Sequence, residues 1–307
     1  STPIYKEILN EMQDISLTTF GNASSIHKFG QETKAIIERA RLSIANDLGC
    51  HLSEIIFTGC GSESNNIAIL GILKKGDHFI TSSYEHPAVL NIANSLVEKG
   101  IDVSYVKPNS AGLINPDDIK NEINSNTKLI SIMYVNNELG TINPINAISK
   151  IAKENNIIFH TDAVQIIGKV KINLKNQNID LLSLSAHKFY GPKGVGALYI
   201  KDNTNLNSTY FGGGQEKSLR PGTENVSGIH GMAAALRKSI KELDSWTETI
   251  NRYEKIFIEN LNKSGIKFMI NGDNRLPGIL NMTFPNILSS DLVMALDMEG
   301  YAISGGS

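Results

Sequence analysis

The chain has 307 residues, of which 41% are hydrophobic and 20% are charged, so it can bury a large core in one or two domains. Its 29 basic and 31 acidic residues give a net charge of -2, and no long basic run is present, which argues against direct binding to nucleic acid. No apolar run is long enough to span a membrane, and the first residues lack a signal-peptide pattern. The only cysteines, Cys50 and Cys60, suit neither a disulfide framework nor a metal site, so we expect a cytoplasmic protein without a structural metal.

From about residue 54 onward, short β-branched runs alternate with longer amphipathic stretches, which is typical of an α/β fold with a mostly parallel sheet covered by helices. The pattern predicts a doubly wound sheet of about seven strands, at residues 54–58, 78–82, 102–106, 128–135, 157–160, 181–185 and 195–200. Helices are expected at residues 64–73, 87–98 and 145–155.

The stretch 227–262 contains no proline and predicts a long helix or a helix pair that leads out of the sheet. We place a domain boundary near Leu243, which gives a large domain at residues 1–243 and a smaller, incomplete α/β domain at residues 244–307. The first 15 or so residues are assigned to the large domain, with the small domain as an alternative packing partner.

Lys188 follows the predicted strand 181–185 directly and precedes a Gly and Pro turn. A partly buried lysine amine of lowered pKa is the group that forms a Schiff base with an aldehyde cofactor. The alternative interpretation is an ordinary loop lysine, and Lys193 is a nearby rival in a more turn-like setting. We favour Lys188.

Asp162 comes at the carboxyl end of the strand 157–160, the edge at which α/β sheets bind ligands. A carboxylate there needs a cationic partner, and a protonated pyridine nitrogen would supply one. The alternative is that the carboxylate caps a helix. Gln165 lies close enough along the chain to reach a hydroxyl on such a ring if the turn is helical.

The Gly-rich turn at residues 59–62 joins a strand to a helix, so backbone N–H groups and the helix N-terminus point outward together. A dinucleotide fingerprint is incomplete here, and a phosphate monoester is the better ligand. Cys60 in that turn is interpreted as a small packed residue rather than a nucleophile. His86 follows another strand and could stack on a flat ring or move protons, although a single histidine is more often structural.

Taken together, these segments resemble the cysteine desulfurases, pyridoxal 5'-phosphate (PLP) enzymes of the aspartate aminotransferase-like fold type I. The resemblance covers nearly the whole chain. It rests on residues 21–27, 59–62, 85–86, 135–141, 162–165, 187–188, 212–216 and 220–225, which follow one another in the order of the family.

The resemblance implies roles for individual residues. Lys188 would be the Schiff-base lysine, Asp162 would bind the pyridine nitrogen, and His86 would stack over the ring. The remaining cofactor and substrate contacts would come from Gly61, Ser62, Asn137, Gln165, Ser185 and His187, the phosphate being held by Gly61, Ser62, Ser185 and His187. Thr223 would reach the phosphate of a neighbouring subunit, which implies a homodimer.

The implied reaction converts L-cysteine to L-alanine and passes the sulfur to an enzyme persulfide. The sulfur would then go to an iron–sulfur scaffold or to a tRNA-thiolation protein. Neither Cys50 nor Cys60 occupies the position of the catalytic cysteine, and both ends of the chain fall inside recognisable motifs. We therefore expect a truncated sequence that keeps the cofactor chemistry but releases no sulfur.

Two other functions remain open from the sequence. One is a transaminase or selenocysteine lyase of the same fold, because fold alone does not determine the reaction. The other is a catalytically inactive, PLP-binding dimer that serves as a scaffold for a partner protein.

Overall fold

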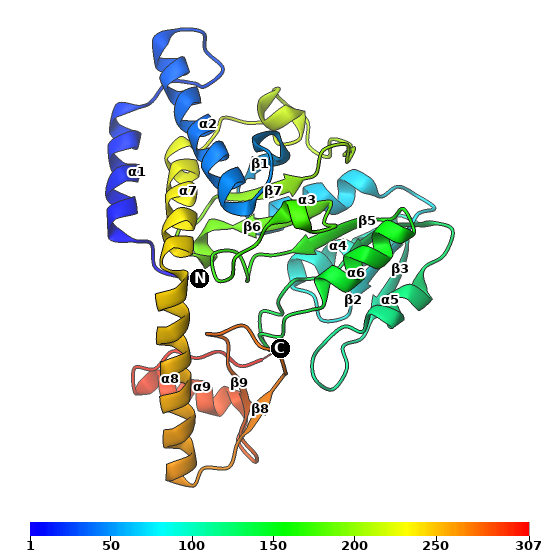
Figure 1. Ribbon diagram of the computed structural model, residues 1–307, viewed down its shortest axis with the longest axis vertical. Coiled ribbons are helices and arrows are strands. Elements are labelled where there is room, and N and C mark those ends of the chain that lie inside the picture. Colours follow the sequence, from blue (N-terminus) through cyan, green and yellow to red (C-terminus); the bar gives the residue numbers. More distant parts are fainter. Residues whose placement is uncertain (307) are drawn as a thin grey trace.

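The computed structural model describes residues 1–306, and its centre is a seven-stranded sheet (Figure 1). The strands follow the order β1-β7-β6-β5-β4-β2-β3. β7 is antiparallel to both of its neighbours, and all other neighbouring pairs are parallel. The strands are β1 (Ile55–Thr58), β2 (His78–Ser82), β3 (Asp102–Val106), β4 (Thr127–Ser131), β5 (Ile158–Asp162), β6 (Leu181–Ser185) and β7 (Gly196–Ile200).

Helices pack on the sheet and extend beyond it. Figure 1 shows α1 and α7 side by side next to α2, and α8 running away from the sheet. The helices of this larger part of the chain are α1 (Lys6–Thr18), α2 (Lys28–Leu48), α3 (Gly61–Ile72), α4 (Pro87–Glu98), α5 (Pro116–Glu122), α6 (Ile145–Glu154) and α7 (Val226–Lys241).

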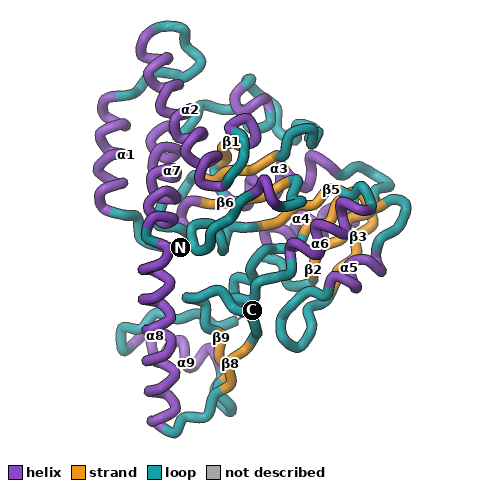
Figure 2. The backbone as a smooth tube through the Cα atoms, viewed as in Figure 1, coloured by secondary structure: helices purple, strands orange, loops and turns teal. Residues whose placement is uncertain are grey.

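A smaller unit follows α7. It consists of α8 (Leu243–Ser264), β8 (Met269–Asn271), β9 (Asn281–Thr283) and α9 (Ser289–Met298), and Figure 2 shows its two orange strands beside α8 and apart from the large sheet. β8 and β9 are antiparallel. The break between α7 and α8 at Glu242 gives a helix pair, which is one of the two alternatives that the sequence leaves open for this stretch.

Most predicted strands and helices begin and end within about three residues of the expected bounds, and β2, β3, β6 and α4 match them at both ends. The strand predicted at residues 128–135 is too long, because β4 ends at Ser131. Beyond that point the N–H groups of Ile132 and Tyr134 still donate to His160 O and Asp162 O of β5, but the regular strand has ended, and Val135 forms an isolated bridge with Ile142. Buried side chains such as Ile132 give this loop the composition of a strand.

Some elements have no counterpart among the predicted ranges, including α1, α2, α5 and β8. α1 packs against α7, which places the first residues with the large sheet rather than with the smaller unit. Tyr5, just before α1, stacks on Tyr190 with ring centroids 4.9 Å apart. The placement of a domain boundary near Leu243 stays a proposal.

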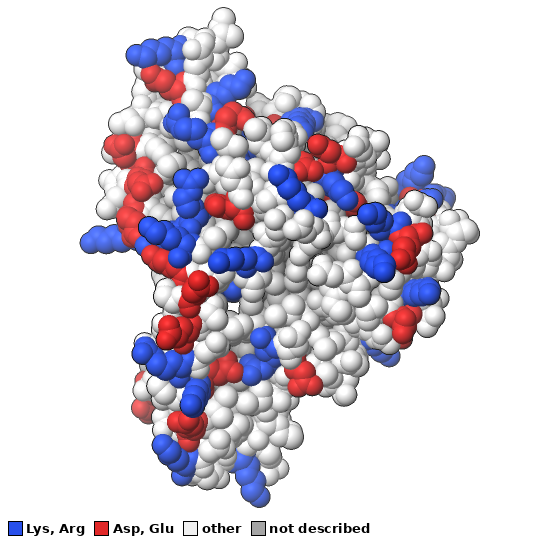
Figure 3. Space-filling view, viewed as in Figure 1, with Lys and Arg blue, Asp and Glu red and all other residues white. Residues whose placement is uncertain are grey.

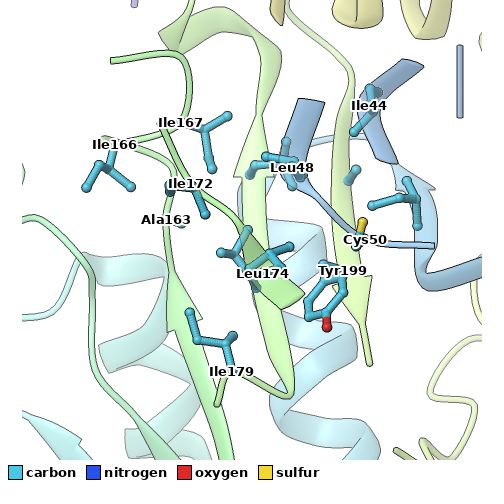
Figure 4. Close-up of a cluster of buried hydrophobic side chains, with 14 of the residues drawn as sticks. Ile44, Leu48, Cys50, Ala163, Ile166, Ile167, Ile172, Leu174, Ile179 and Tyr199 are labelled. Carbon is cyan, nitrogen blue, oxygen red and sulfur yellow. The ribbon is translucent and has the colours of Figure 1, made fainter. Parts of the chain in front are cut away.

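Buried aliphatic and aromatic side chains fill the space between the sheet and its helices. Figure 4 shows part of this core, in which Ile44 and Leu48 of α2 lie near Tyr199 of β7 and Leu174. Because β6 is buried along its whole length, its sequence is a continuous run of Leu and Ser without strict alternation of apolar and polar residues. This rigid core fixes the strand ends that carry the polar residues described below.

Acidic and basic side chains are interspersed on the face of the molecule shown in Figure 3. Among the helices of residues 1–306, none combines the length and apolar character that crossing a membrane requires.

His160 is a buried polar residue inside the sheet. Its Nδ1 lies 2.7 Å from Ser131 Oγ on β4, and its Nε2 lies 3.0 Å from Ser183 Oγ on β6. Burial lowers the pKa of His160 to about 3, so the ring is neutral in the folded protein. The neutral imidazole therefore links three neighbouring strands.

We predict that His160 makes the protein less stable as the pH falls. In the unfolded chain the histidine takes up a proton near pH 6.5, whereas the folded chain resists protonation to about pH 3, so the unfolded state gains protons first. Between these values the contribution to the free energy of unfolding falls by up to about 1.4 kcal/mol per pH unit. Urea unfolding between about pH 7 and pH 5 should show a shallower pH slope for His160→Gln than for the wild type, and an unchanged slope for the exposed control His51→Gln. Equal slopes for all three proteins would contradict the prediction.

Candidate functional site

The carboxyl ends of β2, β4, β5 and β6 meet at one edge of the sheet, where they enclose a cavity of about 180 Å³ together with the N-terminus of α3. Every predicted site residue except Thr223 lines this cavity. They are Gly61, Ser62, His86, Asn137, Asp162, Gln165, Ser185, His187 and Lys188. Thr223 is exposed on the loop that precedes α7.

Asp162 is the last residue of β5 and lies at the bottom of the cavity. Asn65 Nδ2 donates a hydrogen bond to Oδ2 at 2.7 Å, and the backbone N–H of Val164 donates to Oδ1 at 3.0 Å. Burial raises the pKa of Asp162, and these two hydrogen bonds act in the opposite direction. A buried carboxylate held in place by neutral donors is well suited to a cationic ligand group.

Lys188 ends a short 3-10 helix, Ala186–Lys188, that follows β6 directly. The chain then turns through Tyr190, whose φ of 63° is left-handed, and the N–H of Gly191 donates to Ala186 O at 3.0 Å. This tight turn holds Lys188 half-buried in the cavity wall. The rival Lys193 does not line the cavity.

The N-terminus of α3 forms the anion-binding part of the cavity. The N-cap residue Cys60 makes no side-chain cap hydrogen bond, which leaves the first N–H groups of the helix available. A Cβ at Gly61 would lie 2.7 Å from Val164 Cγ2, so only glycine allows the turn to pack this closely. Ser185 Oγ is buried there without a hydrogen-bond partner.

These features fit a phosphorylated pyridoxal ring. The unpartnered Ser185 hydroxyl and the α3 N-terminus suit a phosphate, and the buried Asp162 carboxylate suits a protonated ring nitrogen. Lys188 supplies an amine for the aldehyde in the same cavity.

His86 is the N-cap of α4, and its Nδ1 accepts a hydrogen bond from the N–H of Ala88 at 3.0 Å. This contact orients the ring and leaves Nε2 free to act on a ligand. His187 contacts Ser1 Oγ through Nδ1 at 2.9 Å, and burial lowers its pKa.

Asn137 and Gln165 lie on two loops of the cavity wall. The loop of Asn137 is shaped by Asn136, whose Oδ1 accepts from the N–H groups of Glu138 and Leu139. Gln165 lies in a single helical turn, because the N–H of Ile167 donates to Ala163 O at 3.2 Å. The turn that the sequence analysis requires for Gln165 is therefore present.

Sequence reasoning missed two residues that shape the site, Asn65 and Glu85. Asn65 lies one turn after Gly61 in α3 and is fully buried. The sequence signal that could have identified Asn65 is a polar residue on an otherwise apolar helix face. Glu85 appeared only as a neighbour of His86 in the sequence. Its Oε1 accepts hydrogen bonds from Ser82 Oγ at 2.6 Å and from the N–H of Met133 at 2.9 Å.

A scan against protein families matches residues 1–307 to the aminotransferase class-V model. The chain belongs to the class-V aminotransferase family. A relative from Dictyoglomus turgidum (strain DSM 6724 / Z-1310) named "Cysteine desulfurase IscS" is 46% identical over all of this chain and 79% of its own length. Another of that name, from Methanosarcina thermophila, is 44% identical over all of this chain and 77% of its own length.

Solved structures of the family share the same fold. One titled "NIFS-LIKE PROTEIN" has a TM-score of 0.95 and 36% identity, and covers 99% of this chain and 85% of its own. A second, titled "SspA in complex with cysteine", has a TM-score of 0.88 and 41% identity, and covers 100% of this chain and 87% of its own. The predicted fold class and the predicted family resemblance are confirmed.

We predict that Glu85 is protonated in the folded protein and that its pH effect is opposite to that of His160. Burial raises the pKa of Glu85 to about 8, whereas a glutamate in the unfolded chain titrates near 4.5. The folded state therefore binds more protons between these values, and the contribution of Glu85 to stability is lost as the pH rises through that range.

Urea unfolding between about pH 5 and pH 8 tests this prediction. Glu85→Gln keeps an oxygen that can accept from Ser82 and Met133, so it should remain folded and lose this component of the pH dependence. The exposed control Glu98→Gln should keep the wild-type dependence. A Glu85→Gln profile parallel to that of the wild type would show that the carboxyl group is ionised.

Proposed function

We propose that this protein is a PLP-dependent cysteine desulfurase, which converts L-cysteine to L-alanine and passes the sulfur to an enzyme persulfide. The observation that carries the proposal is the presence of Lys188 and Asp162 in one cavity beside a free helix N-terminus. Relatives named cysteine desulfurase at 41–46% identity over the whole chain support the choice of substrate.

When bound, PLP supplies an electron sink for the substrate Cα. Asp162 would hold the proton on the ring nitrogen, and Asn65 keeps that carboxylate in place through a hydrogen bond from Nδ2. Gly61, Ser62, Ser185 and His187 would bind the phosphate, and Thr223 would add a contact to it from a neighbouring subunit. Asn137 and Gln165, which line the same cavity, would contact the substrate and the ring oxygen.

Proton transfer at the substrate Cα falls to Lys188 Nζ or to His86 Nε2, both of which line the cavity. The persulfide cysteine is not Cys50, because burial raises the pKa of that thiol to about 12 and its thiolate is inaccessible. Cys60 lies in the wall of the phosphate site and is assigned a packing role there.

We predict that Lys188 is the residue to which PLP becomes covalently attached. Borohydride reduction of the PLP-loaded protein, followed by peptide mapping, should label Lys188. Exchange of the Cα hydrogen of L-cysteine in D₂O, followed by NMR, should fall by about 100-fold or more in Lys188→Ala, because the amine is lost as both attachment point and base.

Lys193→Ala is the matched control, because Lys193 lies outside the cavity and should keep wild-type labelling and exchange. Label on another residue, or no label at all, would exclude Lys188 from this role. Product analysis then separates the reactions: alanine formed from L-cysteine without a keto acid supports desulfuration, whereas a keto acid requirement indicates transamination. Turnover confined to selenocysteine indicates a lyase, and loaded protein without turnover indicates a scaffold.

We further propose a homodimer that acts in the cytoplasm with an iron–sulfur scaffold or a tRNA-thiolation protein as sulfur acceptor. Both cysteines are free thiols, which suits a reducing compartment. Large apolar side chains are exposed on two loops near the N-terminus and before α7, including Ile26 at 92% and Phe211 at 88% exposure. Such residues are typical of a surface covered by another subunit.

We predict that sedimentation velocity gives about twice the 33.5 kDa mass of one chain. Phe211→Asp should shift the protein toward the monomer, because a charge at an apolar contact must be desolvated when the subunits meet. Circular dichroism serves as the control for folding. A wild-type monomer at micromolar concentration would contradict the proposed dimer.

A further inference from the structure

The loop that runs from β7 to α7 is anchored by an ion pair inside the protein. Glu216 in this loop has a side chain that is only 3% exposed. Its Oε1 lies 2.7 Å from Arg41 Nη2, and its Oε2 lies 2.9 Å from Arg41 Nη1, which is a bidentate arrangement. The N–H of Phe57 also donates to Oε2 at 2.7 Å, so the carboxylate joins the loop to both α2 and β1.

The backbone at this anchor is strained. Glu216, Lys217 and Ser218 have φ values of 44°, 58° and 62°, and three consecutive residues with side chains in the left-handed region are unusual. Each costs about 1–2 kcal/mol relative to a right-handed conformation. Such strain persists only where the surroundings hold the chain in place, and it is concentrated at functional sites.

The stability of the fold does not by itself account for the ion pair. Removing two charges from water costs about as much as their attraction returns, so a buried pair contributes little net stability compared with an apolar one. A bidentate ion pair does, however, hold the segment that carries it in one conformation. The Arg41 and Glu216 contacts therefore fix the path of the loop.

The fixed path leads directly to Thr223. Gln215, next to the anchor, accepts a hydrogen bond at Oε1 from the N–H of Gly222 at 3.1 Å. Between these residues, Arg220 Nε lies 3.0 Å from Glu63 Oε1 on α3, next to Ser62 in the phosphate turn. The segment before Thr223 is thus held at two points, while Thr223 itself is exposed and lies outside the cavity of its own chain.

We infer that Arg41 and Glu216 are positioning residues that hold Thr223 for the cofactor phosphate of the neighbouring subunit. This inference rests on the proposed function, namely a PLP-binding dimer, and adds two residues to it. Neither residue touches the cofactor, and both act through the loop. Glu216 of one chain therefore affects cofactor binding in the other chain.

Hybrid dimers with differently tagged subunits test this assignment. Only one subunit keeps Lys188, and the other carries Lys188→Ala, so borohydride labelling of Lys188 reports on a single site. The measurement is the PLP concentration at which half of Lys188 is labelled. Glu216→Gln is placed either on the Lys188→Ala subunit or on the subunit that keeps Lys188. The glutamine retains an oxygen that can accept from Phe57 and Arg41, which favours correct folding.

Glu216→Gln on the Lys188→Ala subunit should raise the PLP concentration for half-labelling by about tenfold or more. This is the effect of losing one hydrogen bond to a charged group. The same substitution on the subunit that keeps Lys188 should leave the concentration within about twofold. Glu38→Gln is the matched control, because Glu38 also pairs with Arg41, at 3.2 Å, but is 45% exposed and lies on α2, away from the loop. It should change neither hybrid.

Other outcomes overturn the inference in distinguishable ways. The positioning role is excluded if the PLP concentration for half-labelling rises only when Glu216→Gln is on the subunit that keeps Lys188, or if it rises in neither hybrid. Both results leave the proposed dimer intact. An increase with Thr223→Ala on the Lys188→Ala subunit, without one for Glu216→Gln, keeps Thr223 and rejects its anchor. If the wild-type protein is a monomer and Lys188 is still labelled, both the proposed dimer and this inference are wrong. The assignment of Lys188 as the cofactor lysine would then stand.

Discussion

The site depends on a single buried carboxylate, that of Asp162. It lies at the end of a central strand, where neighbouring parallel strands deliver their last residues to the same edge. Asn65 and the N–H of Val164 hold both oxygens, and burial keeps the pKa of the group raised. A cation at this position would relieve the cost of burying the charge, so the fold prepares the place of the ring nitrogen before any ligand arrives.

Two buried titratable groups near the site, His160 and Glu85, are neutral near pH 7. Burial lowers the pKa of His160 to about 3 and raises that of Glu85 to about 8. His160 is hydrogen-bonded to Ser131 and Ser183 on the two neighbouring strands, and Glu85 accepts a hydrogen bond from Ser82 at the end of β2. The sheet thus contributes hydrogen bonds near the cavity without adding competing charges.

Much of the fold could be predicted from sequence, because strands buried on both faces leave apolar runs bounded by Gly, Pro and Asp. The same rule failed after Ser131, where a buried loop has the composition of a strand. The cavity residues were found because each follows a strand end, and strand ends converge. Asn65 and Glu85 were missed because their partners, Asp162 and Met133, are distant in sequence and only the folded chain brings them together.

Glu63 has two roles on one side chain, since one oxygen contacts the N–H of Gly59 in the phosphate turn and the other contacts Arg220. Evolution therefore cannot alter this residue for one purpose without disturbing the other. In a set of homologues, positions 63 and 220 should vary as a unit, and positions 41 and 216 should do the same. Such covariation would reflect contacts between residues that are far apart in the sequence.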